Sequence, residues 1–300
     1  MMKLHLIFIA LLLSGVSALA QNITADTSVS AVSAYKCTGS SSHICLAASS
    51  EECSGSSCDM TLSKLSDFAT KVCGLTTADT VAVVPQGVTA LPEYAFADCK
   101  QLRHIQLPNT LKEIGDYAFL GCDNLRDIHL PATLTKIGEG AFRECSSIKT
   151  LTIPANVTVL PRYMCAWCAD LQSVALPKGL KDIGSHAFAY CSSLESIQIP
   201  NRVAHIGSNA FSFCSSLKEI SLPVSITELE SYAFSDCSSL KRATLPANDK
   251  MLGEYLFTGC KSLEEIVCMS KKRPTFDCNS PFFDPSENLK IRYITPGWKW

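Results

Sequence analysis

Apolar positions along most of the chain recur with a period of 23 residues. The repeating unit, L-x-x-I-x-L-P-x-x-L-x-x-I-G-x-x-A-F-x-x-C, is clearest between Leu125 and Cys145. Two marker residues keep the period without insertion or deletion: Pro85, Pro108, Pro131, Pro154, Pro177, Pro200, Pro223 and Pro246, and Cys99, Cys122, Cys145, Cys168, Cys191, Cys214, Cys237 and Cys260. A fixed period of this length predicts a solenoid of stacked coils.

The first part of each unit has the alternation of a short strand. Ile105 and Leu107 are separated by polar Gln106, so the two apolar side chains point to the same, inward face. Pro108 ends the strand, because proline has no N–H to donate to a ladder. Strands of successive coils are expected to pair in parallel, about 4.8 Å apart.

The second part of each unit turns back toward the core. Leu111 and Ile114 are expected to point inward, and Gly115 suits a turn with an open backbone conformation. The three-residue spacing between Phe119 and Cys122 predicts a tight helical turn that packs both side chains inside. The unit therefore predicts an α/β repeat solenoid.

This unit resembles the 23-residue repeat of the BspA-like, or Treponema pallidum type, leucine-rich-repeat family. The resemblance covers residues 79–262 and implies a curved arc of about eight coils with a parallel sheet on its concave face. It also implies exported or surface proteins that act in adhesion and protein binding. No catalytic residues come with the family, so an enzyme is not expected.

Four positions depart from the repeat and mark places where it is irregular. In the fourth coil, Pro161 replaces glycine, Met164 replaces alanine and Cys165 replaces phenylalanine. Glu230 occupies another glycine position. We expect information about function where the repeat changes.

The N-terminal residues predict export. Residues 1–20 combine Lys3, an apolar run and a small-residue cleavage site before Gln21, which is typical of a secretory signal peptide. A membrane anchor is the alternative, but the apolar run is shorter than the ~20 residues of a spanning helix. A secreted, extracellular or cell-surface location is therefore expected. A flexible lead-in is expected at 21–36.

Caps are expected at both ends of the repeats. Residues 37–78 would form a disulfide-linked N-terminal cap with a half-repeat, in which Cys73 takes a phenylalanine position; its candidate disulfide partners are Cys37, Cys45, Cys53 and Cys58. A zinc site of the four thiolates is the alternative. Residues 263–300 would form a degenerate last repeat and an aromatic cap. There, Cys268 would pair with Cys278 or else with Cys260.

The cysteines at the end of each repeat are predicted to be buried free thiols. The chain has 16 cysteines, and a redox relay or a metal ladder is the alternative. Parallel stacking at about 4.8 Å suits a small apolar side chain better than a disulfide, whose Cβ atoms lie about 3.8 Å apart. Cys165 and Cys168 form a C-x-x-C pair, but both occupy inward positions, which disfavours redox chemistry.

Charge and composition narrow the choice of partner. The net charge is −2 and the repeats carry no basic run, which disfavours nucleic acid. No cofactor and no resident metal are expected. His104, Asp127 and His129 could meet on the strand face as metal ligands, against the simpler interpretation of a polar face.

Two surfaces are candidates for binding. The strand face offers His104, Gln106, Asp127, His129, Glu219 and Arg242. The position before the repeat cysteine is aromatic in three successive coils, and we call Trp167, Tyr190 and Phe213 the aromatic strip. Aromatic side chains dominate interface hot spots, although local packing against the irregular fourth coil is an alternative. Asn22 and Asn156 lie in glycosylation sequons.

The sequence therefore predicts an exported recognition protein that binds a protein partner and has no catalytic activity. A glycan-binding or cell-wall-associated structural protein is the alternative.

Overall fold

The computed structural model describes residues 68–69, 74–76, 78–246, 253–269 and 289–293. The chain divides into two compact units, Met1–Met60 and Thr61–Trp300, and all described residues belong to the second. The signal peptide, the lead-in, the four cap cysteines, Cys278 and the aromatic residues beyond it lie outside the described residues.

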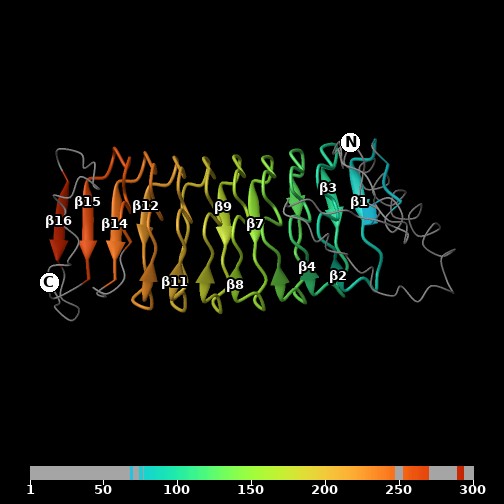
Figure 1. The fold of residues 1–300 in the computed structure, drawn as a ribbon, viewed down its shortest axis with the longest axis horizontal. Helices are drawn as coiled ribbons and strands as arrows, with labels where there is room; N and C mark the ends of the chain where they lie inside the picture. The colour runs from blue at the N-terminus through green and yellow to red at the C-terminus, as the bar shows by residue number, and fades with distance from the viewer. Residues whose placement is uncertain (1–67, 70–73, 77, 247–252, 270–288, 294–300) are drawn as a thin grey trace, which may run out of the picture. The chain divides into compact units, whose positions relative to one another are not determined.

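Two parallel ladders of short strands run through the stacked coils, and they form two rows of arrows in Figure 1. The first ladder comprises β1 (Val81–Val83), β3 (His104–Gln106), β5 (Asp127–Ile128), β7 (Thr150–Thr152), β9 (Ser173–Ala175), β12 (Glu219–Ser221), β14 (Arg242–Leu245), β15 (Glu265–Cys268) and β16 (Lys290–Tyr293). The second comprises β2 (Ala90–Leu91), β4 (Glu113–Ile114), β6 (Lys136–Ile137), β8 (Val159–Leu160), β10 (Asp182–Ile183), β11 (His205–Ile206) and β13 (Glu228–Leu229).

The register of both ladders follows the sequence period. Asp182 pairs with His205 and His205 with Glu228, each 23 residues further along the chain. The solenoid and its parallel sheet are therefore as predicted. The second ladder was not predicted, because a two-residue strand is too short to show alternation.

The expected α/β class is wrong, because the described residues contain no α-helix. The segment from Ala118 to Cys122 is a series of turns instead of a helical turn. It is flanked by Tyr117 (φ 54°) and Gly121 (φ 67°), both in the left-handed region, which a right-handed helix cannot accommodate. The backbone N–H of Phe119 donates to Ala141 in the next coil (2.8 Å), so the turns are hydrogen-bonded across coils and not within a helix.

The left-handed residues form two columns along the solenoid. The first column contains Tyr94, Tyr117, Gly140, Tyr163, His186, Asn209, Tyr232 and Tyr255. The second contains the residues just before the repeat cysteines: Asp98, Gly121, Glu144, Trp167, Tyr190, Phe213, Asp236 and Gly259. The aromatic strip is part of the second column.

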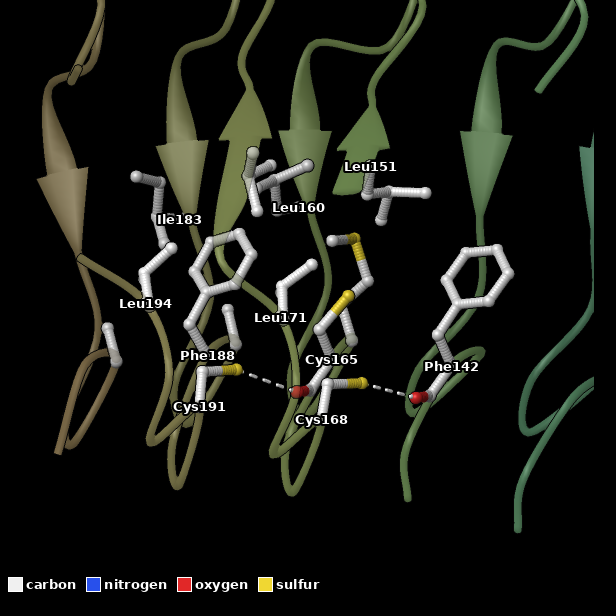
Figure 2. Close-up of a cluster of buried hydrophobic side chains, with 14 of the residues drawn as sticks. Phe142, Leu151, Leu160, Cys165, Cys168, Leu171, Ile183, Phe188, Cys191 and Leu194 are labelled. Carbon is white, nitrogen blue, oxygen red and sulfur yellow. Dashed lines mark hydrogen bonds between the residues drawn. The ribbon is translucent and has the colours of Figure 1, made fainter. Parts of the chain in front are cut away.

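Stacked phenylalanines fill the core. The rings of Phe96, Phe119 and Phe142 lie 5.3–5.4 Å apart, and Phe188 begins a second stack that continues through the later coils. Cys165 stands between the two stacks, as Figure 2 shows. The larger neighbour Met164, also fully buried, offsets the volume that Cys165 removes.

Proline at position 161 explains why the second ladder is divided. Gly138 and Gly184 donate their N–H groups to Ile114 and Leu160 of the preceding coil, at 2.8 and 2.9 Å. Pro161 has no N–H and cannot make the equivalent bond to Ile137. The paired strands accordingly end at β6 and begin again at β8.

The repeat cysteines are buried, as predicted, but they are more than apolar filler. The thiol of Cys168 donates to the carbonyl of Phe142 (3.1 Å), and that of Cys191 to the carbonyl of Cys165 (3.2 Å; Figure 2). The same bond to the preceding coil is made by Cys122, Cys145, Cys214, Cys237 and Cys260. Among the described cysteines from Cys122 to Cys260, none is in a disulfide.

Burial also sets the acidity of these thiols. It raises the pKa of Cys214 to about 12 and that of Cys165 well above its usual value. A redox-active C-x-x-C needs a lowered pKa and access to solvent. The environment of Cys165 therefore has the opposite character.

The C-terminal end contains a strand that the repeat pattern did not predict. β16 extends the first ladder by pairing in parallel with β15. Cys268 is buried at the end of β15, and its predicted disulfide with Cys278 stays a prediction. Within the described residues, none of the secondary structure provides a membrane-spanning helix.

Candidate functional site

The strand face is polar and carries ion pairs between neighbouring coils. His104 Nδ1 lies 3.5 Å from Asp127 Oδ2, and Arg242 Nε donates to Glu265 Oε2 at 2.7 Å. The predicted positions Gln106, His129 and Glu219 are exposed on the same face. The structure brings His104 and Asp127 together, but His129 is not part of that pair.

The middle of this face is uncharged. Its exposed side chains are short or neutral: Thr150, Thr152, Ser173, Ala175, Ser196 and Gln198. Such a face can form hydrogen bonds, but it offers no large apolar anchor of the kind that hot spots use.

The aromatic strip forms a face-to-face stack. Trp167 and Tyr190 have ring centroids 5.0 Å apart at 6°, and Tyr190 and Phe213 have centroids 4.4 Å apart at 5°. The coil ladder sets this spacing, because the N–H of Trp167 donates to Ala189 (2.8 Å) and that of Tyr190 to Ser212 (2.8 Å). Tyr190 and Phe213 are 38% and 40% exposed.

All three residues of the strip hold an unfavourable backbone conformation. Their φ values are 63°, 62° and 59°, a region that costs an L-residue roughly 1–2 kcal/mol. Glycine avoids that cost, and Gly121 and Gly259 occupy the same position in other coils. Ring stacking, worth about 0.5–1.5 kcal/mol per pair, offsets part of it.

The ring faces of the strip are largely occupied. Each inner face contacts another ring, and the guanidinium of Arg143 lies 4.7 Å from the centroid of Trp167. Arg143 in turn donates from Nε to Glu144 (3.0 Å). The strip therefore offers ring edges and the Tyr190 hydroxyl to solvent more than open ring faces.

A second cluster lies on the other ladder, around His205 of β11. Its Nδ1 lies 3.0 Å from Asp182 Oδ1 on β10, and its Nε2 lies 2.9 Å from Glu230 Oε1, just after β13. The other oxygen of Glu230 accepts from the N–H and the hydroxyl of Ser208, at 2.8 and 2.6 Å. Ligand atoms of His205, Glu228 and Glu230 all lie within 4.8 Å of one another.

The carboxylates also set the acidity of this cluster. Partial burial alone would lower the pKa of His205, but the hydrogen bonds to Asp182 and Glu230 outweigh it and raise the pKa. The hydrogen bonds from Ser208 and His205 lower the pKa of Glu230.

The sequence analysis did not identify this cluster, although two signals were present. Glu230 was recognised as an acidic residue at a glycine position. Asp182, His205 and Glu228 also share one position of the repeat at intervals of 23 residues. Neither signal shows that the side chains turn toward each other.

Comparison with known proteins agrees with the fold. The family model described as "BspA type Leucine rich repeat region" matches residues 64–195 and 181–290, in six copies. No curated protein matches.

Several solved structures are similar. A leucine-rich repeat protein from Bacteroides ovatus is 30% identical, with a TM-score of 0.52, over 71% of this chain and 62% of its own. A leucine rich cell surface protein from Faecalibacterium prausnitzii is 28% identical, with a TM-score of 0.46, over 65% and 60%. The T. pallidum leucine rich repeat protein is 26% identical, with a TM-score of 0.39, over 63% and 69%.

This chain spans less than two thirds of the length of the first two of these proteins. The family match nevertheless covers most of the chain, and the observed coils have the period that defines the repeat. The chain belongs to the BspA-type leucine-rich-repeat family.

Proposed function

We propose that this chain is an exported recognition protein that binds a protein partner through the aromatic strip and catalyses no reaction. One observation carries the proposal: three adjacent coils place large aromatic residues at left-handed positions where other coils have glycine. A residue choice that costs backbone energy is consistent with a binding role.

The geometry of the strip favours a protein partner over a glycan. Sugars bind aromatic side chains by lying against an open ring face, and the faces within the strip are stacked on each other. Protein interfaces use aromatic edges, hydroxyl groups and a nearby arginine equally well, and tyrosine, tryptophan and arginine are enriched at hot spots. Arg143 beside Trp167 supplies the arginine.

Export is supported by the sequence of residues 1–20 and by family members described as surface proteins. Mass spectrometry of the mature protein should find Gln21 as the first residue. A chain that retains Met1 in the exported fraction would contradict cleavage at this site.

The binding proposal is tested with a photo-crosslinking amino acid at position 190, with position 152 on the strand face as the matched control. The position-190 crosslink should capture a protein from the surroundings of the cell, and Trp167→Ala should weaken binding of that protein at least about 30-fold, as expected of a hot spot. Capture only from position 152 would move the site to the strand face. Binding of glycans on an array, lost in Trp167→Ala, would favour the glycan alternative.

A further inference from the structure

The cluster around His205 has no role in the proposed recognition, and it lies on the second ladder, away from the positions of the aromatic strip in each coil. From its geometry we propose that His205, Glu228 and Glu230 form a binding site for a divalent transition-metal ion such as Zn²⁺. The inference is independent of the proposed function.

The donor set suits this class of ion. One imidazole nitrogen and two carboxylates are typical zinc ligands, with water completing a tetrahedral site. Magnesium and calcium prefer oxygen ligands throughout, so the imidazole disfavours them. The side chains of His205 and Glu230 are 26% and 34% exposed, which leaves access for the ion and for water.

The distances require little rearrangement. Two ligand atoms at about 2.0–2.1 Å from a tetrahedral ion lie roughly 3.3 Å from each other. His205 Nε2 and Glu230 Oε1 are 2.9 Å apart, and a Glu228 oxygen lies within 4.8 Å of both. A small outward movement of the Glu230 carboxylate would admit the ion.

Supporting hydrogen bonds already orient two of the ligands. Asp182 contacts Nδ1 of His205, which is the arrangement that holds a metal-binding histidine with Nε2 toward the ion. Ser208 fixes one oxygen of Glu230 through its N–H and hydroxyl, which leaves the other oxygen facing His205. An unselected group of surface acids would not have both ligands held from behind.

The position of Glu230 in the repeat adds to this. Gly184, Gly207 and Gly253 occupy the equivalent position, and an added Cβ there would lie 2.2–2.8 Å from atoms of the preceding coil. Glu230 is the acidic residue at this close-packed position, and its side chain reaches back to the coil that carries His205.

The experiment titrates the metal-free full-length chain with Zn²⁺ alone and compares it with His205→Gln and Glu230→Gly. Isothermal titration should show one zinc equivalent in the parent that both variants lose. Glu230→Gly restores the residue found in neighbouring coils, so its metal-free melting temperature checks that the fold is kept. Asp182→Asn should weaken binding roughly 10–100-fold, because it removes only the supporting hydrogen bond.

His104→Gln is the matched control, since His104 also faces a carboxylate but has no second acidic ligand beside it; it should bind as the parent does. Cobalt substitution separates this site from cysteine sites, because thiolate ligands add a charge-transfer band that His205 and the two glutamates do not. Equal zinc binding by the parent, His205→Gln and Glu230→Gly would overturn the proposal, as would no zinc binding by the parent.

Discussion

The aromatic strip and the cysteine column are adjacent in the chain, yet they differ in every other respect. Cys168, Cys191 and Cys214 are fully buried and chemically identical. The residues just before them, Trp167, Tyr190 and Phe213, point outward and differ from the glycine or acidic residues at the same position in other coils.

The difference separates what the fold requires from what it permits. Each inward position must fill the same space and make the same thiol–carbonyl bond to the preceding coil, so its residue type is fixed. The outward position needs only a tolerated left-handed backbone, and its side chain is free to serve another purpose. Variation at such positions is therefore more informative about binding than constancy in the core.

The largest expected difference between the two columns is in thiol reactivity. Burial raises the pKa of Cys214 from 9.0 to about 12, so at pH 8 its thiolate fraction should be roughly a thousandfold below that of a denatured control. Because the thiolate is the reactive form, alkylation should be slow in the native protein and should stay slow as the pH rises toward 9. Peptide-level mass spectrometry after timed alkylation measures this.

Denatured protein labelled under the same conditions is the control for that experiment. Labelling of Cys191 and Cys214 at the same rate with and without denaturant would show that the column is exposed. It would also remove the contrast with the strip.

The next effect is on stability and compares Phe188 in the core with Tyr190 in the strip. Phe188→Ala should lower the free energy of unfolding by about 3–5 kcal/mol, because it opens a cavity and breaks the ring stack. Tyr190→Gly should change it by less than ~1 kcal/mol, because relief of the left-handed backbone offsets the lost stacking. Urea unfolding followed by circular dichroism measures both.

An equally large loss in Tyr190→Gly would show that the strip is part of the core's packing. That outcome would favour the alternative in which the strip exists to support the irregular fourth coil. It would weaken the binding proposal.

Much of the fold could be predicted because a solenoid places residues 23 apart next to each other. The inward positions of Phe119 and Cys122, the parallel strands and the irregular coil at Pro161 all follow from that single spacing. The adjacency of Trp167, Tyr190 and Phe213 follows from it as well, which is why the strip was visible in the sequence.

The backbone conformation and the directions of side chains were decided by the tertiary structure. The spacing of Phe119 and Cys122 fits a helical turn, but left-handed residues on both sides and hydrogen bonds to the next coil replace it with turns. The thiol bonds depend on where a carbonyl of the preceding coil points. The contact of His205 with Glu230 joins residues 25 apart, outside the period, because the side chain after β13 folds back across a coil.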